Sequence, residues 1–367
     1  MVPITKTQAF KQWLPLVSDR WMVSQRYDLF FFIGSCVFTL FFWGLYQVAD
    51  QFHFFLQGDS ILITYFLFSA LLDHPHIFQT FSRTHGDRIE FQRHKTIHTL
   101  GLGCLLAVGL LLASFKLEAE LIVFAALFGS YHIMRQHYGF LKAYKNLNHD
   151  RNRLDDWLDF GTFYSGMFAC FFNDYSGIES PIVIYKDFQC NFPNIPDVFV
   201  EIIWAIFLGF LTLFLLRQLV RWWRKEPLNL PKLLLMLAVL ATHYFIFFMT
   251  ATPFLVAEAL ETAYHDVQYH GWMMQYQTRQ FPTVKHIALK GFAIALLYGV
   301  IVGFIELKGL LDQDVWLWLF MPFTMIVIYH YYVDGIIWKF SSQPELRPML
   351  ITAKTTTVEK NETKIAA

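Results

Sequence analysis

Charged residues are scarce in this chain of 367 residues. Only 16% are Asp, Glu, Lys or Arg, and 29 basic residues balance 29 acidic ones, so the formal net charge is zero. Soluble proteins usually carry about a quarter charged residues. The deficit predicts that much of the surface faces lipid rather than water. The absence of net basic charge argues against a nucleic-acid partner.

Cysteine is scarce as well. The four cysteines, Cys36, Cys104, Cys170 and Cys190, lie far apart and form no CxxC pair. This spacing indicates neither a disulfide framework nor a thiolate metal site. The chain also lacks a P-loop, a GxGxxG turn, a nucleophile elbow and an HExxH helix. Its N-terminus has no charged segment followed by an apolar core, so we expect no cleaved signal peptide.

Long apolar runs dominate what is present, since 55% of the residues are hydrophobic and 40 are Phe. A membrane-spanning helix needs about 20 mostly apolar residues. We therefore predict an all-α polytopic membrane bundle of about ten transmembrane helices, with eight to ten as the range. The predicted spans are 28–49, 60–82, 96–115, 121–143, 157–173, 199–220, 231–252, 254–277, 286–305 and 315–338.

The eighth of these stretches is the least apolar. Its polar residues are Glu258, Glu261, His265, Asp266 and His270. The distribution of Lys and Arg favours counting this stretch as a membrane-spanning helix, because with ten crossings every Lys- and Arg-rich loop falls on one side of the membrane. The positive-inside rule assigns that side to the cytoplasm. We expect both termini there, in a bacterial inner membrane.

The distribution of apolar stretches and basic loops divides the chain into three predicted regions. Residues 1–27 are predicted to be a cytoplasmic N-terminal segment, and residues 28–340 a transmembrane metal-binding catalytic domain. Residues 341–367 are predicted to be a disordered cytoplasmic tail.

Histidines recur in pairs inside the predicted spans, where an ionisable residue indicates a functional site. The motifs YHIMRQHYG (131–139) and YHDVQYHG (264–271) share a Tyr-His-x4-His spacing. Five residues turn about 140° around a helix. Both rings of a pair therefore reach one metal ion only if a π-bulge lies between them. Otherwise the two rings bind two different ions, or one ring binds the ion and the other makes a hydrogen bond that supports the site. The predicted metal ligands are His74, His76, His132, His137, His265, His270 and His330.

Several further residues accompany these histidines. Pro75 is expected to distort its helix so that His74 and His76 converge. Asp334 lies one turn from His330, where it either binds the metal or fixes the imidazole tautomer. The predicted catalytic residues are Tyr131, Tyr264 and Asp334, with Tyr138 as a further hydrogen-bond donor. The additional candidate ligands or supporting groups are His94, His98, Glu261 and His243.

The arrangement resembles the histidine-rich integral-membrane non-haem iron oxygenases. The segments DHPHIF (73–78), YHDVQYH (264–270) and YHYYVDGIIWK (329–339) are similar in order, with different spacing, to motifs of the Brp/Blh-type carotenoid dioxygenases. HKTIH (94–98) is similar to the HxxxH boxes of membrane fatty-acid desaturases and hydroxylases. The resemblance implies one or two non-haem iron ions, O2 as co-substrate and a lipid-soluble substrate. Where electrons are needed, it implies a cytoplasmic electron donor.

We therefore expect an iron oxygenase, embedded among membrane lipids, that hydroxylates, desaturates or cleaves a lipid-soluble substrate. Two alternatives remain open. A haem-binding cytochrome or quinol-linked electron carrier would use His132 or His137 with His265 or His270. A divalent-metal transporter would need ligands through both leaflets, whereas the histidines of the predicted spans cluster in the cytoplasmic half.

Overall fold

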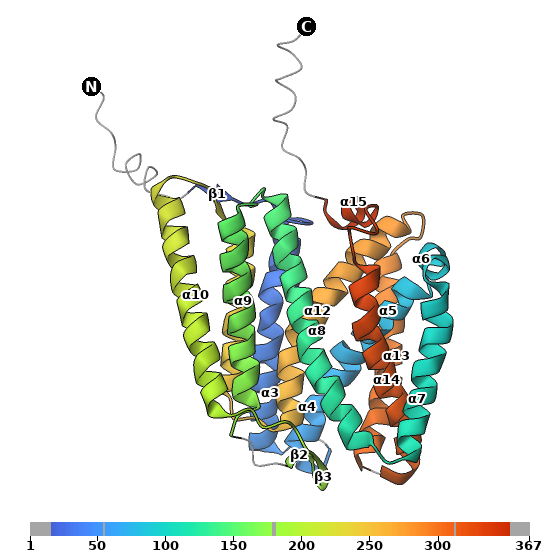
Figure 1. The fold of residues 1–367 in the computed structure, drawn as a ribbon. Coiled ribbons are helices and arrows are strands. Elements are labelled where there is room, and N and C mark those ends of the chain that lie inside the picture. Colours follow the sequence, from blue (N-terminus) through green and yellow to red (C-terminus); the bar gives the residue numbers. More distant parts are fainter. Residues whose placement is uncertain (1–15, 54–55, 178–180, 312, 353–367) are drawn as a thin grey trace, which may run out of the picture.

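The computed structural model describes residues 16–53, 56–177, 181–311 and 313–352. Most of them form long helices that run roughly side by side between two ends of the molecule (Figure 1). The first half of the chain contains β1 (Val17–Ser18), α2 (Gln25–Asp28), η1 (Leu29–Ile33), η2 (Gly34–Cys36), α3 (Val37–Phe52), η3 (Leu56–Gly58), α4 (Ser60–Phe68), η4 (Ser69–Asp73), α5 (His74–Thr84), α6 (Arg88–Arg93), η5 (Ile97–Gly101), α7 (Leu102–Ser114), α8 (Glu118–Leu147) and α9 (Arg153–Asp174).

The second half completes the bundle around a long central helix. Its elements are β2 (Ile182–Tyr185), β3 (Phe188–Cys190), α10 (Asp197–Trp223), β4 (Leu228–Asn229), α11 (Leu230–Tyr244), η6 (Phe245–Met249), α12 (Phe254–Gln280), α13 (Ile287–Leu311), α14 (Gln313–Ile337) and α15 (Leu346–Leu350). The described chain is therefore an all-α bundle with two small two-stranded pairings.

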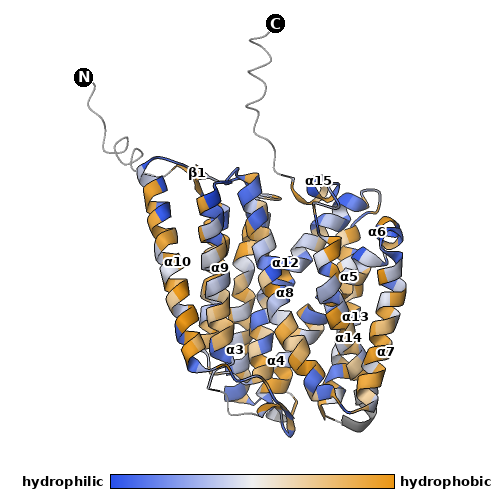
Figure 2. Cartoon of the chain, viewed as in Figure 1, coloured by the Kyte–Doolittle hydropathy of each residue, from blue (hydrophilic) through white to orange (hydrophobic). Residues whose placement is uncertain are grey.

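Seven helical segments within the described ranges are long and apolar enough to cross a membrane. They are Gln25–Phe52, Ser60–Thr84, Ile97–Ser114, Asp197–Trp223, Leu230–Met249, Ile287–Leu311 and Trp318–Ile337. Figure 2 shows apolar residues along most of α10 and α7, with polar residues gathered at the two ends of the bundle. Lengths and composition together indicate a multi-pass membrane protein.

Helices α8, α9 and α12 lie at the three remaining predicted spans, so a long helix occupies each of the ten predicted stretches. These three helices are more polar than the other seven segments, and each carries buried polar or charged side chains. Helix α12 is the most enclosed, with buried residues along most of its length and contacts to α3, α4, α5, α8 and α13. Its polar residues therefore face other helices rather than lipid.

Side-chain caps fix where several helices begin. Asp59 accepts a hydrogen bond from the Leu62 amide at the start of α4, and Asn152 accepts from the amides of Leu154 and Asp155 at the start of α9. Such caps satisfy amide groups that have no partner inside the helix. The ends of the helices are thus set locally by sequence.

The chain ends of the described part lie at one end of the bundle. There β1 pairs in parallel with β4, while β2 and β3 form an antiparallel pair at the opposite end (Figure 1). The predicted disordered tail, 341–367, differs from the structure over 346–350, which form α15. Leu346 and Leu350, one turn apart, are buried in the main core, and this burial explains why the segment folds. Residues 353–367 lie outside the described residues.

Candidate metal centre

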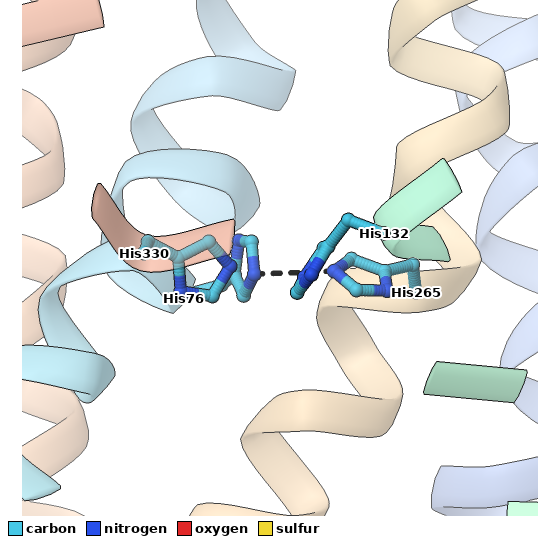
Figure 3. A group of neighbouring side chains, drawn as sticks. All are labelled: His76, His132, His265 and His330. Atoms are coloured by element: carbon cyan, nitrogen blue, oxygen red, sulfur yellow. Dashed lines mark hydrogen bonds between the residues drawn. The ribbon is translucent and has the colours of Figure 1, made fainter. Parts of the chain in front are cut away.

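Four imidazoles from four different helices meet inside the bundle. His76 comes from α5, His132 from α8, His265 from α12 and His330 from α14, and one ring nitrogen of each lies within 4.8 Å of those of the others. None of the four residues is more than 6% exposed. Figure 3 shows the rings turned toward a common centre, which we call the four-histidine centre.

The nitrogens at this centre lack ordinary partners. Nε2 of His76 lies 3.2 Å from Nε2 of His265, while Nε2 of His132 and Nε2 of His330 have no hydrogen-bond partner among the described residues. A buried polar atom left unpaired costs about 1–3 kcal/mol. Nitrogens that share one ion at about 2.1 Å lie roughly 3–4 Å apart. The donor atoms present therefore fit a transition-metal ion.

Thr80 and Asp334 orient one side of the centre. Nδ1 of His330 lies 2.6 Å from the Thr80 hydroxyl, and Oδ1 of Asp334 accepts a hydrogen bond from Tyr269 at 3.0 Å. Oδ2 of Asp334 lies 4.0 Å from Nε2 of His132. These contacts fix which nitrogen of His330 faces the centre, as expected of groups that support metal-binding histidines.

Asp266 contacts the imidazole of His76. Its Oδ1 lies 3.0 Å from Nδ1 of His76, and its side chain is fully buried on α12. Nδ1 of His76 also lies 3.1 Å from the Asp73 carbonyl oxygen, so Nε2 is the nitrogen that faces the centre. With a metal ion bound by neutral imidazoles, ionised Asp266 and Asp334 would supply two negative charges. That is the charge needed to balance a buried divalent cation.

Each Tyr-His-x4-His motif contributes one ring. Helices α8 and α12 are regular through both motifs, with no π-bulge. His132 and His265 therefore face the centre, while His137 and His270 point elsewhere. The His137 ring lies 5.8 Å from that of His243, and Nε2 of His270 lies 3.3 Å from the Leu72 carbonyl oxygen.

The expected convergence of His74 and His76 does not occur. The π-helical turn η4 precedes His74, and Pro75 sits in the first turn of α5. His74 instead places Nε2 3.0 Å from Oε2 of Glu306 on α13. Ser69 also donates to that carboxylate. His74 is thus held by α13, away from the four-histidine centre.

The other predicted residues are spread around the centre. Tyr131 is 46% exposed, and the hydroxyl of Tyr264 donates to the Phe32 carbonyl oxygen. Tyr138 packs against the rings of α9. His243 donates from Nδ1 to the Val239 carbonyl oxygen. Of the predicted catalytic residues, only Asp334 lies beside the centre.

Sequence reasoning missed four residues next to the centre. They are Thr80, Asp266, Tyr269 and Tyr331. Thr80 follows His76 by four residues and Tyr269 follows His265 by four, while the other two are chain neighbours of ligands. A spacing of one helical turn from a histidine of the centre is the sequence signal that could have identified Thr80 and Tyr269.

A second group of ligand-type residues lies at the end of the bundle that holds α6. Oxygen or nitrogen atoms of Glu90, His94 and His98 lie within 4.8 Å of one another. Burial raises the pKa of Glu90, but the neighbouring His98 imidazole and the charge of Arg83 outweigh burial and lower that pKa to about 2. Glu90 is therefore an anion at neutral pH. The structure separates this group from the four-histidine centre.

A cavity of about 180 Å³ is lined by residues of α8, α12, α14 and β2, and none of the four histidines is among them. Tyr331, which lines it, stacks on the ring of His132 at 4.8 Å between centroids. The cavity wall also contains Asp174, Glu258 and Glu261. Glu261 thus belongs to the cavity rather than to the histidine cluster.

The fold and the site together define a class, a multi-pass helical bundle with a buried four-histidine cluster flanked by carboxylates. No family model, no curated protein and no solved structure matches the chain. The function is therefore argued from the site itself.

Proposed function

We propose that this chain is a membrane-embedded non-haem iron oxygenase that oxidises a lipid-soluble substrate with O2, by hydroxylation, desaturation or oxidative cleavage. The observation that carries the proposal is the convergence of four buried imidazoles with unpaired nitrogens. Imidazole ligands suit iron among the first-row metals, and thiolate ligands are absent from the group. Bound iron would supply the O2 and redox chemistry that no side chain provides.

The chain's own residues contribute orientation, charge and exclusion of water. Asp266 lies 3.0 Å from Nδ1 of His76, and Asp334 lies 3.7 Å from Nδ1 of His330, so each carboxyl group is near the ring nitrogen that faces away from the centre. The Thr80 hydroxyl fixes His330. Because the site is enclosed, the attraction between these carboxylates and a bound cation is stronger than it is in water. This arrangement favours a retained metal over a transient one.

The cavity supports a substrate with a polar group. A molecule bound against Tyr331 would be separated from His132 only by the Tyr331 ring, which stacks on the imidazole. A pure hydrocarbon would leave the carboxyl groups of Asp174, Glu258 and Glu261 without partners, at a cost in desolvation. We therefore propose a lipid-soluble substrate that carries a hydroxyl or basic group at this end. Any electron donor would reach the site from the end that holds α6.

The haem alternative fits this geometry poorly. Two axial histidines of a haem face each other across the porphyrin plane. Here the other two imidazoles occupy the space that the macrocycle would need, since all four ligand atoms lie within 4.8 Å. The bis-His interpretation of His132 with His265 therefore finds no support.

One observation favours a divalent-metal transporter as the second candidate. Polar groups continue from the centre in both directions along the bundle, through His74 and Glu306 toward β2 and through His98 and Glu90 toward α6. A transporter needs such ligands along its path. The enclosed centre and its paired carboxylates favour the oxygenase.

We further propose that all ten long helices cross a bacterial inner membrane, with both termini cytoplasmic. β1 and α15 lie at the same end as α6, which requires an even number of crossings (Figure 1). The basic loops 83–95, 142–153 and 217–232 also lie at that end. The positive-inside rule places such loops in the cytoplasm.

Metal analysis tests the oxygenase. Protein purified in mild detergent and reconstituted with Fe²⁺ under anaerobic conditions should retain iron and show no Soret band. His132→Ala and His265→Ala should each lose the ion of the four-histidine centre, because three imidazoles hold it less tightly than four. His53→Asn is the matched control, since His53 is exposed with φ 51°, a conformation that Asn tolerates.

Two results would contradict the proposal. One is iron content that is unchanged in both histidine variants. The other is release of metal from the wild-type chain coupled to uptake into sealed proteoliposomes, which identifies a transporter.

A further inference from the structure

We propose that Glu90, His94 and His98 form a second site for a divalent transition-metal ion, separate from the four-histidine centre. Their ligand atoms lie within 4.8 Å of one another, and Glu90 and His98 are buried. Glu90 and His94 lie between the second and third predicted spans and His98 lies in the first turn of the third, at the end of the bundle that holds α6. This inference does not depend on a metal in the four-histidine centre.

The local backbone brings these residues onto one face. Asp87 caps α6 by accepting hydrogen bonds from the amides of Ile89 and Glu90. The amide of His94 donates to the Glu90 carbonyl oxygen, and that of His98 donates to the His94 carbonyl oxygen. These hydrogen bonds keep the three residues about one turn apart, although His94 follows the end of α6 with non-helical dihedrals (φ −123°, ψ 34°). The three side chains thus meet at the junction between α6 and η5.

The coordinating atoms are available and aimed at one another. Nδ1 of His98 is fixed by the Tyr329 hydroxyl at 2.7 Å, which leaves Nε2 to face Oε1 of Glu90 at 3.7 Å. Nε2 is buried and has no hydrogen-bond partner among the described residues. Oε1 of Glu90 also lies 2.6 Å from Nδ1 of His94. Three donor atoms thus surround one point.

Ion pairing alone does not account for this group. Arg83 donates to Oε2 of Glu90 at 3.0 Å and to Oδ2 of Asp87 at 3.1 Å, which balances the Glu90 charge through Oε2. Oε1 contacts Nδ1 of His94, but Nε2 of His98 lies 3.7 Å from Oε1 and is left without a hydrogen-bond partner among the described residues. A cation bound by Oε1 and the two imidazoles would satisfy this nitrogen, whereas without one it remains buried and unpaired.

The ligand set indicates the class of ion. Two imidazoles and one carboxylate suit Zn²⁺, Fe²⁺ or Co²⁺ rather than Ca²⁺ or Mg²⁺, which prefer oxygen ligands. Three protein ligands leave coordination positions open. The side chain of His94 is 24% exposed, so the ion has access from the aqueous end of the bundle. The Tyr329 contact links the site to α14, on which His330 is the next residue.

Cobalt binding tests the site in the full-length chain. Metal-free protein carrying His132→Ala, which disables the four-histidine centre, is titrated with Co²⁺ in detergent and followed by the visible absorption of coordinated cobalt. We expect one remaining ion per chain. Adding His98→Ala or Glu90→Gln should weaken its binding at least about tenfold, since loss of a ligand exceeds the effect of losing a supporting group.

Matched controls make the result decisive. His149→Asn in the same background changes an exposed histidine at the same end of the bundle and should leave cobalt binding unchanged. Gel filtration and circular dichroism check that each variant folds. If His98→Ala fails to fold, Glu90→Gln still tests the site, because glutamine keeps the size and shape of the glutamate side chain. If the His132→Ala chain binds no cobalt, or if the added Glu90→Gln leaves the affinity unchanged, the second site is refuted. Loss of metal from the His132→Ala chain together with normal binding in wild type leaves only the proposed function standing.

Discussion

Two buried carboxyl groups lie beside the histidines of the four-histidine centre. Asp266 faces Nδ1 of His76, and Asp334 lies beside His132 and His330. Both are among the buried residues of the bundle. A buried carboxylate without a cation is expensive. Their placement beside the same cluster is consistent with the proposed cation.

Replacing Asp334 by Asn tests this role. The amide keeps the size of the carboxyl group and an oxygen that accepts from Tyr269, but it removes the negative charge. We expect metal affinity to fall about 10- to 100-fold, the range typical of groups that support ligands. Isothermal titration of the metal-free protein with Co²⁺ measures the change. Tyr269→Phe, which keeps the charge, should have a smaller effect, and equal losses in both variants would argue against charge balance.

The sequence shows the pairs of histidines, but it does not show which member of each pair faces the four-histidine centre. Regular helices turn His132 and His265 inward and carry His137 and His270 away, because five residues do not return to the same face. Asp266 and Thr80 were not predicted because their role depends on which helices pack together. Residue type indicated the chemistry, while tertiary contacts select the ligands.

At the scale of elements, α13 positions the helix that carries His76. It packs along η4 and α5, and Gly299 lies at the closest approach. A Cβ atom at this position would lie 2.5 Å from the Ala70 carbonyl oxygen and 2.5 Å from Cδ of Pro75. The absence of a side chain at Gly299 thus lets α13 hold the π-helical turn that precedes His76.

Gly299→Ala should therefore disturb both stability and the metal site. Overpacking typically costs about 1–3 kcal/mol, and the backbone of α5 must move to relieve the contact. Thermal unfolding in detergent should show a lower midpoint, and cobalt binding at the four-histidine centre should weaken. Gly103→Ala on α7 is the control, because nothing lies within 4 Å of its added Cβ. There, alanine should be neutral or slightly stabilising. Similar losses in the two variants would mean that packing at Gly299 has no special role.

Helix positions were largely predictable, and the reason is composition. Long apolar stretches need helices in lipid, since every backbone group must be paired within the segment. The π-helical turns η4 and η5 were not predictable at their positions, nor was α15, whose burial depends on contacts with the main core. Apolar length predicts elements, whereas local irregularity follows from packing.

At the scale of the whole molecule, the membrane topology depends on whether the polar helix α12 crosses the membrane. This helix carries His265 and Asp266 and is buried along most of its length. Its neighbours can shield it from lipid, so its low hydropathy does not prevent it from crossing. If α12 crosses, residues just before it and just after it lie on opposite sides of the membrane.

Cysteine labelling on a Cys104→Ala background tests this topology. Ala251 and Lys285 are exposed and flank α12, while Asp187 and Arg151 are exposed at opposite ends of the bundle. A membrane-impermeant maleimide applied to intact cells should label Ala251→Cys and Asp187→Cys. Lys285→Cys and Arg151→Cys should react only after the membrane is opened, because the positive-inside rule places their loops in the cytoplasm. Labelling of Ala251→Cys and Lys285→Cys from the same side would show that α12 does not cross the membrane. Nine crossings would then remain, an odd number. Because β1 and α15 lie at the same end of the bundle, a second long helix would also have to stay uncrossed.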